Sequence, residues 1–343
     1  MTATVRSPSR SRCPSLFLAL ALALAGPAVA SAGTAAASAA TGDLDLQPRW
    51  QAGEQRDYHF TKERLRGPTG GTHLELRVSG DLHLEVVSTG ASGSVIALTT
   101  GATRVETPGQ AENPLYSRMA QVMDGLRLLM DVSADGTLQR IRNFDEIRQA
   151  GRSAASTVAA SMAASGAERA ATDRFTSVIG SLFGDESRVR QVATSELQLL
   201  LQPLGRRYPR AGGPEEDARL PLPGAAAPVP THARYALGAT AADTGLVQLA
   251  WTQTADPAAF AASVNEAAAR REAGKAASGP LPSAGKGPVG TVASLNERAD
   301  FAIDARSGWV DHVMQRRVID VNGGVQEETA EIVRRPAGDA KSP

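Results

Sequence analysis

The segment 126–147 constrains the fold of this chain most strongly, because the spacing of its apolar residues changes part-way along it. In its first part apolar and polar residues alternate, and Asp135-Gly136 interrupts them with a pair typical of tight hairpin turns, in which glycine accepts a positive φ. From Asn143 onward the apolar residues recur about every 3.6 positions, which indicates a helix. The segment therefore predicts a β-hairpin that leads into a helix, with Asn143 and Glu146 at the spacing of a capping box.

Alternating apolar runs predict antiparallel strands on both sides of this segment. The alternation continues throughout 73–87, and two structures fit it: one long strand with a bulge at Gly80, which we favour, or a hairpin that turns there. A short helix is expected at 113–124, and Asp256-Pro257 predicts the N-cap and first position of another helix. The other predicted strands cover 55–65, 95–105, 233–237, 245–252, 291–304, 309–321 and 325–334, and Asn322-Gly323 is expected to form the turn between the last two.

A helical block is predicted between the two strand-rich parts. Narrow, alanine-rich apolar stripes mark three helices, which should pack on one another and on a sheet face. The third helix is expected to have Asp185 as its N-cap and to end near Pro203. Proline and glycine are frequent at 206–231, which we interpret as an extended connector.

These elements predict an α+β fold, an antiparallel β-sheet with an inserted central helical block. The hairpins at 132–141 and 303–313 have similar spacings from glycine to apolar residues, which leaves two alternatives open: two related halves or a chance likeness. The predicted organisation is a signal peptide at 1–30, a flexible leader at 31–43, a first antiparallel β unit at 44–142, the helical block at 143–205, the Pro/Gly-rich connector at 206–231, a second antiparallel β unit at 232–334 and a disordered tail at 335–343.

The first thirty residues have the three parts of a secretory signal peptide. Three arginines precede an uncharged apolar run at 16–25, and Ala28-Val29-Ala30 is an A-x-A cleavage site, with Ala28 and Ala30 as its small residues. The run is shorter than the about 20 residues that span a bilayer, so cleavage is favoured over an uncleaved anchor. We expect the mature protein in the periplasm or secreted, with no transmembrane segment after cleavage.

Cysteine content and net charge exclude several further classes of protein. The single cysteine, Cys13, precedes the apolar run, so neither a lipid anchor nor a disulfide of the mature chain is predicted, and stability must come from packing. The chain has 36 basic and 36 acidic residues, and three of the basic ones lie in the signal, so the mature chain has a net charge of about −3. The chain has no block of basic residues of the kind that indicates a nucleic-acid partner.

Several of these features resemble a group of secreted bacterial proteins of uncharacterised function. The features are the signal peptide, the opening Trp50, Gly53 and Tyr58, the Asp135-Gly136 hairpin followed by Phe144-Asp145-Glu146-Ile147, and the closing hairpin from Asp304 to Gly308. More remotely the chain resembles the periplasmic lipoprotein carriers. That resemblance covers most of the mature chain and implies a curved antiparallel sheet that wraps helices and holds an acyl chain. None of its motifs is catalytic, and no functional residue carries over.

Residues that could support catalysis or metal binding are poorly placed for it. His73, Glu75, His83 and Glu85 could share one sheet face, but such residues commonly pair across strands, and no H-E-x-x-H spacing exists. There is no mature cysteine, G-x-S-x-G turn or P-loop. We therefore predict no metal, no cofactor and no catalytic residue, and favour a binding protein over an enzyme.

The tryptophans lie on predicted strands or at strand edges, where such residues usually fill a core. A sharper hypothesis is that Trp251, Trp309 and Met314 line an apolar cavity between sheet and helices. We predict an exported, non-catalytic protein that binds an apolar small molecule or a cell-envelope partner. The alternative is an envelope assembly or scaffold protein without a small ligand, and an unrecognised hydrolase is the third hypothesis.

Overall fold

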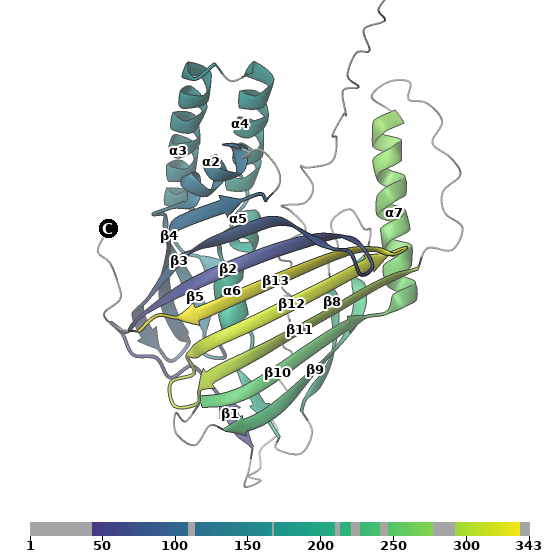
Figure 1. Ribbon diagram of the computed structural model, residues 1–343. Helices are drawn as coiled ribbons and strands as arrows, with labels where there is room; N and C mark the ends of the chain where they lie inside the picture. Colours follow the sequence, from purple (N-terminus) through teal and green to yellow (C-terminus); the bar gives the residue numbers. More distant parts are fainter. Residues whose placement is uncertain are drawn as a thin grey trace, which may run out of the picture.

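The computed structural model describes residues 43–108, 114–166, 168–209, 213–220, 227–240, 246–276 and 292–336 (Figure 1). Eleven strands form one antiparallel sheet in the order β6-β5-β4-β3-β2-β13-β12-β11-β10-β9-β8, and β1 pairs with β7 separately. The strands are β1 (Leu44–Leu46), β2 (Gln55–Pro68), β3 (His73–Gly90), β4 (Gly93–Glu106), β5 (Arg127–Ser133), β6 (Leu138–Ile141), β7 (Arg206–Tyr208), β8 (Glu215–Leu220), β9 (Val229–Thr240), β10 (Leu246–Ala255), β11 (Ala293–Asp304), β12 (Val310–Val321) and β13 (Gly324–Arg334). The helices are α2 (Pro114–Met123), α3 (Phe144–Ala164), α4 (Arg169–Phe183), α5 (Glu186–Ala193), α6 (Ser195–Leu201) and α7 (Pro257–Ala276). This arrangement confirms the predicted α+β class.

Two runs of consecutive strands meet in the middle of the sheet. Strands β2 to β6 form one run and β8 to β13 the other, and β13 pairs with β2, where Ile332 lies opposite Phe60. Helices α3 to α6 lie between the two runs in the chain, on one side of the sheet (Figure 1). The duplication of the two runs stays a prediction.

One face of the sheet, which we call the inner face, carries the apolar core. Every second residue of β2 and β3 points to it, so Tyr58, Phe60, Leu82 and Leu84 are buried. Helix α6 contacts β12 on this face, and α3 and α5 contact β5 and β6 (Figure 1). Helix α7 covers a second, smaller apolar cluster that is separate from the main core, and it contacts β9 and β11 there.

Strand β3 is unbroken, which confirms the long strand and excludes a hairpin at Gly80. The bulge that we expected in β3 lies in β4 instead, opposite Gly80, where the pairing gains one residue and Ala102 has a φ of +50°. Gly80 has a different role, because a Cβ at this position would lie 2.8 Å from Cε1 of Phe60. The glycine therefore makes room for an aromatic ring on the neighbouring strand.

The predicted capping box at the start of α3 is wrong, although the helix begins where the pattern predicts. The side chain of Asn143 makes no hydrogen bond to the helix. Its Oδ1 accepts the N–H of Leu129 at 2.8 Å and its Nδ2 donates to the carbonyl of Arg127 at 2.9 Å. The amide is occupied in joining α3 to β5, so it cannot also cap the helix.

The third predicted helix is two helices, α5 and α6, so the described part of the helical block has four rather than three. Asp185 caps α5 as predicted, because its carboxylate accepts the N–H of Ser187 at 2.8 Å. Thr194 separates the two helices, and its hydroxyl donates to the carbonyl of Arg190 at 2.5 Å. Such local side-chain bonds compete with the regular helix, and apolar spacing does not reveal them.

The region 206–231, predicted as a connector, contains two whole strands and the start of β9 in its described part. Strand β7 pairs with β1, and β8 pairs with β9 at the edge of the large sheet. Tyr208 is buried and donates to the carbonyl of Pro203 at 2.6 Å, while Arg206 Nε bonds Glu216 at 2.9 Å. Proline and glycine content gives no sign of such long-range partners, so the prediction missed these strands.

The remaining local predictions can be placed briefly. Asp256 caps α7 by accepting the N–H of Ala259 at 2.7 Å, and Asn322-Gly323 forms a turn with φ values of +53° and +78°. Both were predicted. Among the described helices, none is long and apolar enough to cross a bilayer. The predicted signal peptide, nearly all of the leader and most of the tail lie outside the described residues.

Candidate functional site

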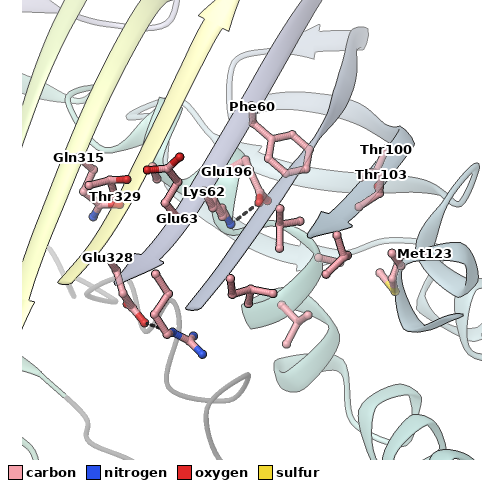
Figure 2. Close-up of a pocket in the computed structure, with 18 of the residues that line it drawn as sticks. Phe60, Lys62, Glu63, Thr100, Thr103, Met123, Glu196, Gln315, Glu328 and Thr329 are labelled. Atoms are coloured by element: carbon pink, nitrogen blue, oxygen red, sulfur yellow. Dashed lines mark hydrogen bonds and ion pairs between the residues drawn. The ribbon is translucent and has the colours of Figure 1, made fainter. Parts of the chain in front are cut away.

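A cavity of about 220 Å³ lies between the inner face of the sheet and the helical block. Its walls come from strands β2, β3, β4, β12 and β13 and from helices α2, α4, α5 and α6 (Figure 2). Most of the wall surface is apolar, and its larger apolar side chains are Phe60, Leu76, Val78, Val105, Met123, Ile179, Leu182 and Val192. The charged lining residues all lie on β2, β12, β13 and α6. The space is therefore apolar with one polar side.

Small side chains leave this space open. Ala120 of α2, Ala193 of α5 and Ala330 of β13 all line it, at positions where a larger apolar side chain would reach into the space. Val192 also lines the cavity and is 39% exposed, so the cavity opens to solvent beside α5. Of these three alanines, only Ala193 belongs to the helical block.

A largely buried ion pair joins the sheet to the helical block at the polar side. Lys62 of β2 pairs with the carboxylate of Glu196 of α6 (Figure 2). Lys62 Nζ also donates to Ser195 Oγ at 3.0 Å, and Ser195 Oγ donates to the second oxygen of Glu196 at 2.9 Å. The two charged side chains are only 19% and 10% exposed, so each depends on the other for compensation of its charge.

Charged residues of alternating sign continue across the inner face from this pair. Arg64 of β2 bonds Glu328 of β13 at 3.1 Å, and Arg317 of β12 bonds both oxygens of Glu297 of β11 at 3.1 Å. Glu328 also lies 3.8 Å from Arg317. Because an unpaired charge is costly to bury, the alternation of sign is what allows these four side chains to share the interior.

Uncharged polar side chains extend the same line across β10 and β9. Gln253 lies opposite Glu297, is almost fully buried, and donates to Thr231 Oγ1 at 2.7 Å. We call the six residues of this line the polar row: Arg64, Glu328, Arg317, Glu297, Gln253 and Thr231. The polar row separates the cluster under α7 from the main core, to which the cavity residues Phe60 and Ile179 belong.

Two buried tyrosines elsewhere in the main core are held in their neutral form. Burial raises the pKa of Tyr235 to about 12 and the pKa of Tyr208 well above its usual range. Their rings meet edge to face with centroids 5.5 Å apart, and the guanidinium of Arg206 lies 5.0 Å from the centre of the Tyr235 ring. These shifts result from packing and supply no acid or base that works near neutral pH.

Trp251, Trp309 and Met314, which were predicted to line a cavity, do not line this one. Trp251 is buried within the main core, whereas Met314 is 37% exposed on the opposite face, because the two-residue repeat of β12 turns its neighbours inward. Trp309 stacks on Trp50 with ring centroids 4.8 Å apart, and its Nε1 donates to Glu54 at 2.7 Å.

Three of the four residues considered for metal binding, Glu75, His83 and Glu85, have other partners. His83 Nδ1 lies 2.7 Å from Asp57 Oδ1, and Glu85 bonds Arg127 at 2.8 Å. In the part of the chain that the structure describes, no group of three or more His, Cys, Asp or Glu residues is arranged to hold a metal ion. The hypothesis of cross-strand pairing on a polar face describes these residues well.

Sequence reasoning missed Lys62, Glu196 and Arg317. One signal could have found the first of them, because Lys62 follows Tyr58 and Phe60 at two-residue spacing and must share their buried face. A charged residue in an apolar register needs a partner. That partner could not be found from spacing, since α6 is distant in sequence and its orientation depends on the break at Thr194.

Comparison with known proteins gives a distant structural likeness and no family. No family model and no curated protein matches the chain. A solved structure of lipovitellin, described by its lipid–protein interactions, is similar over 85% of this chain with 11% sequence identity and a TM-score of 0.41. The chain covers only 26% of the length of that protein. A likeness of this degree carries no argument about what this chain does.

Proposed function

We propose that this chain is an exported, non-catalytic protein that binds an apolar ligand, about the size of one acyl chain, in the cavity between the sheet and the helical block. The observation that supports binding is the cavity itself, which is about 220 Å³ in volume, largely apolar and open beside α5. The signal-peptide pattern at 1–30 supports export.

The volume narrows the class of ligand. An engineered apolar cavity of about 150 Å³ accepts benzene, and pockets for drug-sized molecules hold about 300–1,000 Å³. The present cavity, at about 220 Å³, lies between these sizes. One unbranched chain that enters past Val192 and lies among Phe60, Met123 and Ile179 fits this space, whereas a lipid with several chains exceeds it.

A scaffold role without a small ligand has less support. Such a role calls for a large contiguous apolar surface. Among the described residues, the large apolar side chains that are exposed lie on different elements: Val87, Val192, Val292, Met314 and Val333. Single exposed apolar residues are ordinary on protein surfaces, so they indicate no docking face. Val192 is the exception, because it lies at the cavity.

The proposal is tested by blocking the opening of the cavity with a large side chain. Val192→Trp places an indole ring on a side chain that lines the cavity, and Ser187→Trp places the same ring on an exposed position of α5 outside the lining. Binding is measured by the fluorescence of the uncharged probe N-phenylnaphthylamine. We expect Val192→Trp to bind the probe at least about tenfold more weakly than the parent chain, and Ser187→Trp to bind it with unchanged affinity. If both variants bind the probe as the parent chain does, the ligand does not occupy this cavity and the proposal fails.

A further inference from the structure

We infer that the cavity selects amphiphiles whose polar head carries no net charge, and that Glu196 excludes anionic heads by neutralising Lys62. This inference rests on the proposed function and adds the class of head group to it. It follows from how the charged side chains of the cavity wall are paired, which the size and apolar lining of the cavity do not reveal.

Positive and negative side chains are balanced along the cavity wall. Its charged lining residues include Lys62, Arg64, Arg317, Glu196 and Glu328, and Glu297 beside Arg317 supplies a third negative charge, whereas the carboxylate of Glu63 bonds Arg77 on the other face of the sheet. Each cation contacts a carboxylate, since Lys62 pairs with Glu196, Arg64 with Glu328 at 3.1 Å, and Arg317 with Glu297 at 3.1 Å. The pocket therefore offers no cation whose charge is uncompensated.

The carboxylates are as fully occupied as the cations. Glu196 accepts from both Lys62 and Ser195, and Glu297 accepts from Arg317 and from the amide of Gln315. An anionic head would have to displace one of these carboxylates, and the displaced group would remain buried without a partner. A cationic head would likewise have to displace a buried cation, because every nearby carboxylate already has a positive partner.

Uncharged heads can use a group that this network leaves to the cavity. Thr100 of β4 lines the cavity, and because it lies opposite the buried Leu82 its hydroxyl is on the inner face (Figure 2). A threonine hydroxyl both donates and accepts hydrogen bonds, which suits the hydroxyl and ester groups of a monoacylglycerol or a fatty alcohol. Such a head adds no charge that would require rearrangement of the ion pairs.

The test compares three ligands with the same chain and different heads. Calorimetric titration below the micellar range would use monolaurin, which is uncharged, laurate, which is anionic, and dodecyltrimethylammonium, which is cationic. We expect the parent chain to bind monolaurin about tenfold or more tightly than either charged ligand. Equal affinities for the three ligands, or a preference for laurate, would overturn the inference while the proposed function stood. If none of the three binds, the proposed function falls as well.

The role of Glu196 is tested by removing its charge alone. Glu196→Gln keeps the shape of the side chain and leaves Lys62 without a counter-charge, so the affinity for laurate relative to monolaurin should rise about tenfold. Glu106→Gln is the matched control, because Glu106 is exposed on β4 outside the cavity and the change in net charge is the same. An unchanged laurate-to-monolaurin ratio in Glu196→Gln, or an equal shift in the control, refutes the role. Should Glu196→Gln fail to fold by circular dichroism, Glu328→Gln, which weakens the compensation of Arg64, is measured in its place and must show the same shift.

Discussion

The buried pair between Glu297 and Arg317 allows a quantitative test of how the inner face is stabilised. Their side chains are 1% and 8% exposed, and the guanidinium makes three contacts of 3.1–3.2 Å with the carboxylate. In Glu297→Leu, Arg317 keeps only Glu328, at 3.8 Å, as a partner of opposite charge. Removing one member of a buried pair costs about 3–5 kcal/mol. Because Arg317 keeps its contact with Glu328, the cost for this variant should lie near the lower end of that range. We expect a loss of about 3 kcal/mol in the free energy of unfolding.

The double variant Glu297→Leu/Arg317→Met separates the charge effect from packing. Replacing both partners by apolar residues of similar volume is often close to neutral, and Glu328 retains Arg64, so we expect a stability within about 1 kcal/mol of the parent chain. Urea unfolding followed by circular dichroism measures both variants. In thermal unfolding the single variant should melt about 6–12 °C below the parent. A single variant that loses less than about 1 kcal/mol, or a double variant as unstable as the single one, would show that charge compensation does not hold the row together.

Two further predictions concern packing and titration. Gly180→Ala on α4 should stabilise the chain by about 0.5–1 kcal/mol, because nothing lies within 4 Å of the added methyl group. Gly151→Ala on α3 should destabilise it by about 1 kcal/mol, because the methyl group would overlap the ring of Phe183. Urea unfolding measures the stability of both variants, and equal shifts would contradict the packing seen between α3 and α4. Burial raises the pKa of Tyr235 to about 12 in the folded chain, so stability that is fully present below the ordinary pKa of about 10 should be lost as the pH rises through 12, by about 2–3 kcal/mol. Tyr235→Phe should reduce the alkaline decline by about this amount and leave the part that Tyr208 contributes, and a decline of undiminished size in the variant would assign it to other groups.

Elements that depend on neighbours in sequence could be predicted closely. The turns at Asp135-Gly136 and Asn322-Gly323 require positive φ values, which glycine and asparagine adopt most easily, and both turns are present. The N-caps at Asp185 and Asp256 were read correctly for the same reason, since a cap bonds an N–H only two or three residues away. Alternation likewise located the long strands.

Features that depend on distant partners were missed. Asn143 has the spacing of a capping residue, yet its amide bonds the backbone of β5, which no local pattern encodes. Strand β7 forms in a stretch rich in proline and glycine because β1, which is distant in sequence, pairs with it. The pairing of β13 with β2 joins two runs into one sheet and could not be read from either strand alone.

The candidate site shows the same division. Sequence alone determined that an antiparallel sheet and alanine-rich helices would face each other, because strand and helix periods place apolar residues on one side of each element. It did not determine what lines the space between them, and the tryptophans chosen from the sequence lie elsewhere. Only the tertiary structure brought Lys62 to Glu196 and aligned Arg64, Glu328, Arg317 and Glu297 in one row. The physical reason is that charge compensation acts over a few ångströms in space, and the pairing of distant strands and the break between α5 and α6 decide which charges come that close.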